Sequence, residues 1–415
     1  MTTLDVPPPP IPVRVDLPET YGADPVEMWQ WLHRYAPVYW FEERRFWIVS
    51  GWEHVRTVVR DDQLFTSTRG NQFVPRDERS GRDVKYADAV DQRIKVPRII
   101  DMDGEQHAAY RRLISKSMTP RLIRTLETKI RVLIDDILSS VDPNGTLDVV
   151  ESLAVPLPTY MISELLGVPI EDRDEFRRWS EAIIAQSRAD GVPPTKELEE
   201  MFPYFEDLLQ QRTKEPKDDL LSTLGQASGS SLNYKFAASE LIQLCTTLLA
   251  GGNETTRNLI SGGVHALLDF PDERKRLVAH PEIVDNAVEE MLRYVSPVRY
   301  FGRVATRDTE LDGQQIKEGD AIFMYFSAAN RDPSVYPDPD RLDLTRDLSK
   351  APHLSFASGP HFCAGAHLAR LETSLFFTEF HKRFPDYELA GDVVTEPNLI
   401  SNITLELPIR LRPAS

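Results

Sequence analysis

The chain has 415 residues, of which 41% are hydrophobic and 27% charged, a composition typical of a folded protein that excludes disorder over the whole length. Its formal net charge of −17 makes nucleic acid and anionic membrane surfaces poor partners, because both attract a surplus of Lys and Arg. No apolar run approaches the roughly 18 residues of a membrane-spanning helix, and the N-terminus has no signal-peptide pattern. Two cysteines make no disulfide framework. We therefore expect a cytoplasmic protein without an anchor.

The first elements predicted along the chain are an arm and a β-hairpin. Prolines at positions 7–10 and 12 predict an extended N-terminal arm over about residues 1–20, with a docking motif for a proline-binding module as the alternative. Two apolar runs, Val38–Phe41 and Phe46–Val49, flank a short polar turn and predict a hairpin. The polar stretch over residues 65–101 has no clear period, which is typical of a functional loop.

Helical patterns dominate the remainder of the chain. Apolar residues at i, i+3, i+4 spacing predict a helix that begins at Pro120 and ends before Pro143. Residues 240–269 predict a long helix of roughly 45 Å at 1.5 Å per residue, and Pro281 begins another that ends near Tyr294. Short strands are expected over residues 315–326 and 403–411. No composition break or repeat is visible, so the chain predicts one mainly α domain (α+β) with small β-sheets over residues 1–415.

The most informative stretch surrounds Cys363, which lies between Gly359 and Gly365 and directly before a helical pattern. A tight loop containing glycine can direct backbone N–H groups at a sulfur atom, and the following helix N-terminus adds partial positive charge. This environment favours a metal-bound thiolate. From spacing alone, a buried structural cysteine remains the alternative, because that is the usual place of a lone cysteine.

A second unusual stretch is Gly251-Gly252-Asn253-Glu254-Thr255 in the long helix. Two consecutive glycines in a helix interior cost about 1 kcal/mol each relative to alanine, so their use is the space that they leave for a flat ligand. Thr255 follows Gly251 by four residues, so its hydroxyl can bond the Gly251 carbonyl and open the helix locally for oxygen and a water. Taken alone, a solvated Glu254 and a packed Thr255 are the simpler interpretations.

Residues 356–365 resemble the haem-binding loop of the cytochrome P450 superfamily, Phe-x-x-Gly-x-His/Arg-x-Cys-x-Gly, at every fixed position. The resemblance implies the cytochrome P450 fold, with haem b between the long central helix and the cysteine loop. It makes Cys363 the axial ligand of the iron, His361 a propionate ligand and Phe356 a neighbour of the sulfur. Ala357 departs from the family, which usually has Gly or Ser there. Because alanine is small we expect little disturbance, although a tight φ would be less comfortable for it than for glycine.

The long helix matches a second motif of the same family, Ala/Gly-Gly-x-Asp/Glu-Thr-Thr. The resemblance implies that Glu254 and Thr255 form the acid–alcohol pair that delivers protons to oxygen. It also implies that Gly251 and Gly252 lie against the haem.

Three further cationic or donor side chains match the family's propionate ligands. His107 and Arg111 share one helix face at i, i+4, and Arg303 follows a Phe-Gly pair. Together with His361 they would place four groups around two carboxylates, which favours charge-assisted hydrogen bonds. Scattered basic surface residues are the alternative.

Glu290 and Arg293 form a Glu-x-x-Arg pair on one helix face, a weak signal alone because most such pairs are surface salt bridges. The family joins this pair to a third residue, here Arg341, in a buried structural triad that supports the cysteine loop. Removing one member would leave a buried charge at a cost of about 3–5 kcal/mol.

The resemblance implies a monooxygenase that uses O₂ and hydroxylates an apolar small molecule. Because the chain has no flavin or nicotinamide fingerprint, electrons would come from a ferredoxin and its reductase. A local basic patch could receive the ferredoxin, or its members could be solvated helix charges; it consists of Arg112, Lys116, Arg121 and Arg124.

The substrate is less well defined by the sequence. We expect residues 65–101 and 156–217 to form a mobile roof over an apolar pocket, with Val298, Tyr300 and Phe301 approaching the haem from one side. Residues 252–258 are similar to family members that oxidise steroids and branched lipids, although terpenoids or aromatics would also fit. The alternatives to a monooxygenase are a peroxide-driven haem-thiolate enzyme, a haem-thiolate sensor or carrier, and a cofactor-free helical binding protein.

Overall fold

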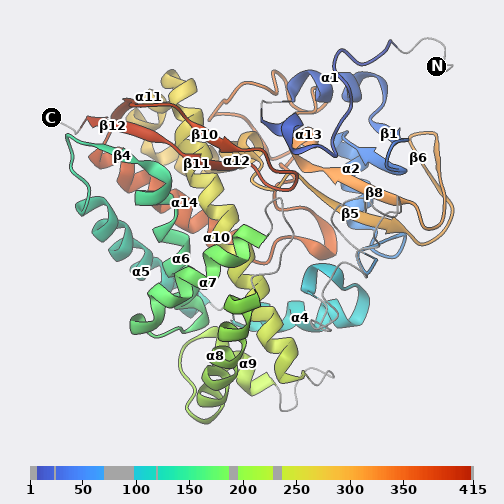
Figure 1. Cartoon of the computed structure of the whole chain (residues 1–415). Helices are drawn as coiled ribbons and strands as arrows, with labels where there is room; N and C mark the ends of the chain where they lie inside the picture. The colour runs from blue at the N-terminus through green and yellow to red at the C-terminus, as the bar shows by residue number, and fades with distance from the viewer. Residues whose placement is uncertain are drawn as a thin grey trace.

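The computed structural model describes residues 7–22, 25–69, 98–117, 120–186, 195–227 and 236–412. A large helical part surrounds the long helix α10, and a smaller part rich in β-strands contains the N-terminal hairpin (Figure 1). The helices are α1 (Val26–Tyr35), α2 (Trp52–Arg60), α4 (Gly104–Ser117), α5 (Pro120–Ser139), α6 (Pro156–Leu166), α7 (Arg173–Gln186), α8 (Thr195–Lys214), α9 (Leu220–Ala227), α10 (Ala238–Asp269), α11 (Pro271–Ala279), α12 (Val284–Val295), α13 (Phe326–Ala329) and α14 (Ala366–Arg383).

The largest sheet has the strand order β1-β2-β8-β5-β3. Its β1 and β2 pair antiparallel, as the hairpin prediction requires, whereas β2 and β8 pair in parallel. Three smaller sheets have the orders β4-β12-β9, β10-β11 and β6-β7. The strands are β1 (Val38–Phe41), β2 (Phe46–Val49), β3 (Phe65–Thr66), β4 (Thr146–Asp148), β5 (Tyr300–Ala305), β6 (Thr309–Leu311), β7 (Gln314–Ile316), β8 (Ala321–Tyr325), β9 (Asp386–Leu389), β10 (Val394–Glu396), β11 (Ile403–Glu406) and β12 (Pro408–Arg412).

The predicted helices are confirmed, including those that begin at Pro120 and span residues 240–269, and short strands are present in both stretches where the sequence predicts them. The stretch 315–326 divides into β7 and β8 at Gly319, whose φ of 87° turns the chain. The stretch 403–411 divides into β11 and β12, which belong to different sheets, and Pro408 begins the second. Most of the loop predicted over residues 65–101 lies outside the described residues; its first two residues form β3.

α10 is the central element of the helical part and packs against α6, α7, α12 and α14. Its buried face contributes to the main hydrophobic core, and α14 contributes aromatic side chains to the same core. The N-terminal arm packs on α1, where Trp31 Nε1 donates to the Pro7 carbonyl at 2.9 Å. Across the described residues, no helix is both long enough and apolar enough to cross a membrane.

Candidate functional site

The loop before α14 places Cys363 at the end of a tightly wound segment. A short 3₁₀ turn, Gly359–His361, precedes the cysteine, and the Cys363 N–H donates to the Phe356 carbonyl at 2.9 Å. Gly359 has a φ of 68°, and a Cβ there would lie 2.9 Å from the Arg60 Cα of α2. Only glycine satisfies both the turn and this close approach, so the spacing seen in the sequence has a structural cause.

The two cysteines of the chain lie in different electrostatic surroundings. Burial raises the pKa of the Cys363 thiol, but the Gly365 N–H and the positive charges of Arg111 and Arg370 act in the opposite direction and favour a thiolate. Cys245 lies inside α10 with no exposed surface, and burial raises its pKa to about 12. Cys363 is therefore the cysteine that suits a metal ligand.

Ala357 occupies a left-handed backbone conformation. Its φ is 56°, a region that favours glycine and strains residues with a Cβ by roughly 1–2 kcal/mol. The tight φ that would be uncomfortable for an alanine is therefore present at this departure from the family pattern.

Donor side chains converge beside the cysteine loop, where the sequence predicted propionate ligands. The rings of His107 and His361 stack with centroids 4.1 Å apart. Burial lowers the pKa of His107 to about 4, assisted by the positive charges of His361, Arg111 and Arg303. The structure thus brings all four predicted groups within electrostatic range of one another.

Sequence reasoning missed Asp103 in this cluster. His361 Nε2 lies 3.0 Å from the Asp103 carboxylate, which also accepts hydrogen bonds from Thr66 and Ser67. Burial opposes ionisation of Asp103, but these hydrogen bonds outweigh it and hold its pKa below the usual range. The sequence held one signal for Asp103: it follows closely on the segment 65–101, which was predicted as a functional loop. Spacing alone could not single out this aspartate.

The donor cluster fits a ligand with two carboxylates. Burial lowers the pKa of both Arg111 and Arg303, and Arg303 is only 4% exposed. In the part of the chain that the structure describes, neither arginine forms an ion pair with a carboxylate. Buried guanidinium groups without such partners are costly, and haem propionates would supply the missing charges. Cys363, His107, Arg111, Arg303 and His361 are therefore the residues that would hold haem b.

The glycine-containing turn of α10 also has open space on one side. Thr255 Oγ1 donates to the Gly251 carbonyl at 2.7 Å, as the sequence predicted. A Cβ on Gly251 would meet nothing within 4 Å, whereas one on Gly252 would lie 3.1 Å from Ile162 Cδ1. Gly251 thus faces open space and Gly252 packs against α6. α10 runs through this turn without a break, from Ala238 to Asp269.

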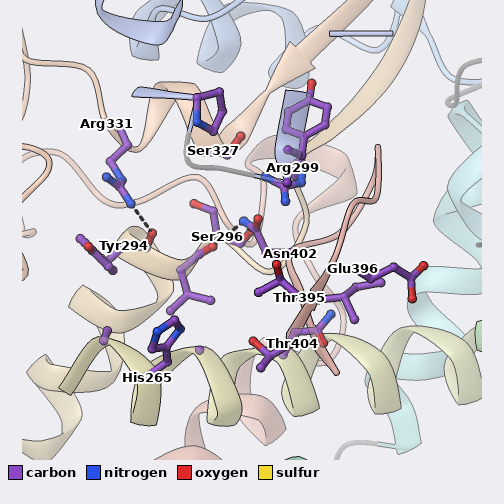
Figure 2. Close-up of a pocket in the computed structure, with 18 of the residues that line it drawn as sticks. His265, Tyr294, Ser296, Arg299, Ser327, Arg331, Thr395, Glu396, Asn402 and Thr404 are labelled. Atoms are coloured by element: carbon purple, nitrogen blue, oxygen red, sulfur yellow. Dashed lines mark hydrogen bonds between the residues drawn. The ribbon is translucent and has the colours of Figure 1, made fainter. Parts of the chain in front are cut away.

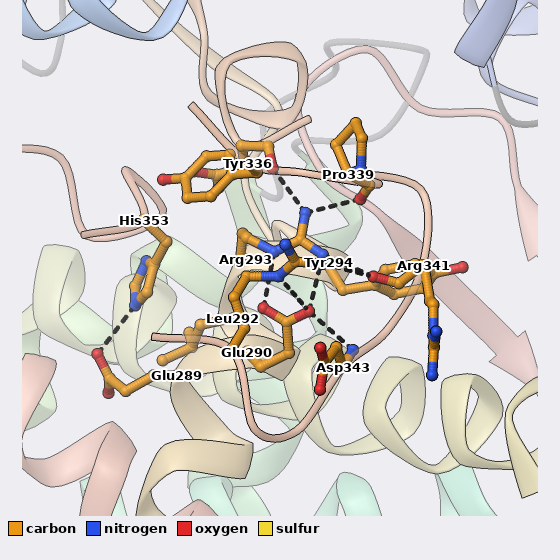
Figure 3. A network of polar contacts seen from close by, with 12 residues as sticks. Glu289, Glu290, Leu292, Arg293, Tyr294, Tyr336, Pro339, Arg341, Asp343 and His353 are labelled. Atoms are coloured by element: carbon orange, nitrogen blue, oxygen red, sulfur yellow. Dashed lines mark hydrogen bonds and ion pairs between the residues drawn. The ribbon is translucent and has the colours of Figure 1, made fainter. Parts of the chain in front are cut away.

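Figure 3 shows the buried ion network around Glu290 and Arg293, two neighbours on α12. Arg293 donates to both Glu290 oxygens at 2.7 and 2.8 Å, and neither side chain has exposed surface. The prediction that Arg341 completes the triad is wrong: Arg346 Nε donates to Glu290 at 3.1 Å. Only the Arg341 carbonyl joins the network, where it accepts from both Arg293 and Arg346; its side chain is 61% exposed and lies 3.8 Å from Glu273.

The same network reaches the cysteine loop through Asn330. Arg293 donates to the Asn330 carbonyl at 2.8 Å. The Asn330 side chain accepts from the Leu354 N–H and donates to the Ser355 hydroxyl, which in turn donates to the Leu292 carbonyl of α12. These bonds hold the chain directly before Phe356, so the ion network positions the loop.

A second ion network lies nearer the cysteine and was not found from the sequence. Glu289 accepts from Arg370 at 2.5 and 2.9 Å and contacts His353 Nε2 at 3.2 Å. Burial opposes ionisation of Glu289, but these hydrogen bonds lower its pKa to about 2. The Arg370 guanidinium also lies 4.6 Å from the centre of the Phe356 ring. This network orients the Phe356 side chain beside the cysteine. Its members are far apart in the sequence, so only the tertiary structure reveals the network.

A surface cavity of about 320 Å³ lies elsewhere, between the C-terminal half of α10, the end of α12 and the β10-β11 hairpin (Figure 2). Polar side chains dominate the view, among them Arg299, Arg331 and Asn402. None of the residues predicted for the site contributes to its lining. This cavity is therefore separate from the cysteine site.

Comparison with known proteins gives a consistent result. The family model "Cytochrome P450" matches residues 6–393. The vitamin D(3) 25-hydroxylase of Pseudonocardia autotrophica is 36% identical over 374 residues, which covers 89% of each chain. The structure of CYP109Q5 from Chondromyces apiculatus has a TM-score of 0.83 at 31% identity and covers 97% of this chain and 98% of that one. CYP109E1 from Bacillus megaterium, solved with testosterone, has a TM-score of 0.81 at 29% identity, covering 94% and 99%.

Proposed function

Since this chain belongs to the cytochrome P450 family of haem-thiolate monooxygenases, we propose that it hydroxylates an apolar small molecule of the steroid or lipid class with electrons from a ferredoxin. The observation that carries the proposal is the position of Cys363 beside a cluster of four donor groups, two of which, Arg111 and Arg303, form no ion pair with a carboxylate among the described residues. No other described cluster combines a partly exposed thiol with groups suited to two carboxylates.

Haem b held by a thiolate supplies the activation of O₂, because the sulfur donates electron density to the iron. The side chains of this protein bind and orient that group. Cys363 provides the thiolate, and His107, Arg111, Arg303 and His361 would bind the propionates. The Phe356 carbonyl restrains the Cys363 backbone, which limits movement of the sulfur.

Proton delivery is assigned to Glu254 and Thr255 on α10. The hydroxyl of Thr255 is fixed by its bond to the Gly251 carbonyl, and its oxygen remains able to accept a hydrogen bond from water or from a protonated Glu254. Glu254 is half-buried next to it in sequence, where a carboxyl group can exchange protons with solvent. Because Gly251 has no side chain, the Thr255 hydroxyl stays accessible from the open face.

Two relatives support the substrate class. One is named for 25-hydroxylation of vitamin D(3), and another is solved with testosterone. Val298 and Phe301 are partly exposed and suit an apolar pocket. Tyr300 does not, because neighbouring residues of a strand point to opposite faces and Tyr300 packs against Phe323 and Tyr325 in the core.

The electron donor is proposed to bind near the outer side of the cysteine loop. Phe362, next to the cysteine, is 37% exposed, and His367 is exposed at the start of α14. Arg112 and Lys116 of the predicted basic patch are also exposed, while the side chains of Arg121 and Arg124 lie outside the described residues. An exposed apolar residue beside the cysteine, together with exposed positive charges on α4, suits an acidic ferredoxin.

The absorption spectrum of the reduced, CO-treated protein tests the haem-thiolate assignment. We expect a strongly red-shifted Soret band, and its absence would overturn the proposal. Titration with testosterone and vitamin D(3) should then produce a low-to-high-spin shift. Turnover with NAD(P)H, a ferredoxin and its reductase should give hydroxylated product and should exceed turnover with hydrogen peroxide alone. The reverse ranking would favour the peroxide-driven alternative, and no product from either would favour a sensor or carrier.

A further inference from the structure

A buried hydrogen bond joins the long helix to a helix of the predicted roof. Asn253 Nδ2 of α10 donates to the Ser180 hydroxyl of α7 at 2.5 Å, across 73 positions of sequence. Asn253 is 2% exposed and Ser180 has no exposed surface. The bond is therefore an interhelical contact inside the protein, shielded from competition by water.

Helix geometry places Asn253 behind the proton-delivery pair. At about 100° per residue, Asn253 and Thr255 point in nearly opposite directions around α10. Thr255 shares its face with Gly251, which has open space before it. The back of the same turn contacts α7 through Asn253, and its flank contacts α6 through Gly252, which lies about 60° from Thr255 around the helix. The rotation of this turn, and hence the direction of Thr255, depends on these two contacts.

Stability alone does not account for an asparagine at this position. Asn253 Oδ1 is buried and has no hydrogen-bond partner among the described residues. A buried acceptor without a partner costs about 1–3 kcal/mol, and an apolar pair of similar size would avoid that cost. The rule that buried polar atoms have hydrogen-bond partners is broken most often where function requires it.

We propose that Asn253 and Ser180 are positioning residues, whose hydrogen bond aligns the Glu254–Thr255 turn with α7. The inference deepens the proposed function and rests on it, because it assigns no chemistry to either residue. According to this inference, α7, a helix of the predicted roof, controls how protons reach the site.

The double variant Asn253→Leu/Ser180→Ala tests this alignment, with Ser261→Ala as a matched control. Ser261 is equally buried on α10, but its hydroxyl donates to the Arg257 and Asn258 carbonyls of its own helix. In the double variant we expect an unchanged or higher Tm and an intact CO spectrum. Amide hydrogen exchange over residues 251–257 of the haem-free protein should accelerate several-fold. With testosterone as the probe, the share of electrons that enters product should fall two- to five-fold, and hydrogen peroxide should rise.

Wild-type hydrogen exchange and wild-type coupling in the double variant would overturn the positioning role, while the wild-type CO spectrum would still support the proposed function. Slower exchange, or an equal loss of coupling in Ser261→Ala, would also overturn it. If the wild-type protein lacked the red-shifted band, the proposed function would fail instead, and the exchange measurement would separately decide whether the contact orders this turn.

Discussion

The loop that carries Cys363 and the α10 turn that carries Thr255 are held in opposite ways. Behind the loop, Glu290 and Arg293 are fully buried and each is bound by several partners. In the α10 turn, Asn253 forms an interhelical side-chain bond, its amide oxygen has no partner among the described residues, and Gly251 faces open space. A metal ligand needs a fixed position, whereas a turn that admits oxygen and water needs free volume. The comparison indicates that changes behind the loop should affect haem binding, and changes in α10 should affect how electrons are used.

The largest expected effect lies in the loop itself. Cys363→Ala should abolish the red-shifted CO band, because no other cysteine is placed to bind iron. Cys245→Ala is the matched control and should keep the band, since Cys245 is buried inside α10. An unchanged spectrum in Cys363→Ala would refute the ligand assignment.

The corrected ion network gives the next effect. Arg346→Ala should reduce the free energy of unfolding by about 3–5 kcal/mol and lower the haem-to-protein ratio, because Glu290 would keep a buried charge with fewer partners. Arg341→Ala should change stability by less than about 0.5 kcal/mol, since its side chain is 61% exposed. Denaturant unfolding and haem content measure both. A larger loss in Arg341→Ala would restore the triad predicted from sequence.

In the α10 turn the expected change is in electron use. Thr255→Ala should retain haem and substrate binding but divert reducing equivalents to hydrogen peroxide, because the hydroxyl that passes protons is gone. Thr247→Ala removes a threonine of the same helix that bonds its own i−4 carbonyl at 2.8 Å and should couple normally. Product and peroxide per NAD(P)H are measured. Wild-type yield in Thr255→Ala would exclude the proton-relay role.

The donor cluster beside the cysteine loop should make the stability of the haem-free protein depend on pH. Burial lowers the folded-state pKa of His107 from 6.5 to about 4, so the unfolded chain binds the proton more readily between these values. Stability should therefore be full above about pH 6.5 and should fall, by up to about 3 kcal/mol, as pH drops toward 4. His107→Gln should remove this part of the pH dependence, as measured by unfolding at several pH values; an identical profile would contradict the shift.

The smallest effect concerns local strain in the loop. Ala357→Gly should raise the free energy of unfolding by about 1 kcal/mol, because glycine adopts a φ of 56° without a steric cost. Haem content and coupling should not change. A destabilised Ala357→Gly protein would show that the alanine methyl contributes more by packing than it costs in strain.

Several parts of the site could be predicted from short spacings. The helix from Pro120, the long helix over residues 240–269 and the Thr255–Gly251 contact follow from periods and offsets within a few residues. Strand pairing was less predictable: the sequence indicates short strands over residues 403–411 but not that β11 and β12 join different sheets, because that depends on which neighbouring strand each one finds.

By itself the sequence determined the cysteine loop, the family and the set of donor residues, since these depend on local backbone geometry and on residue types at fixed spacing. Only the tertiary structure decided that Arg346 rather than Arg341 meets Glu290, that Asp103 binds His361, and that Asn253 reaches Ser180. The physical reason is that each of these contacts joins segments far apart in the chain. Their partners are selected by how the helices and loops pack, and no local pattern encodes that choice.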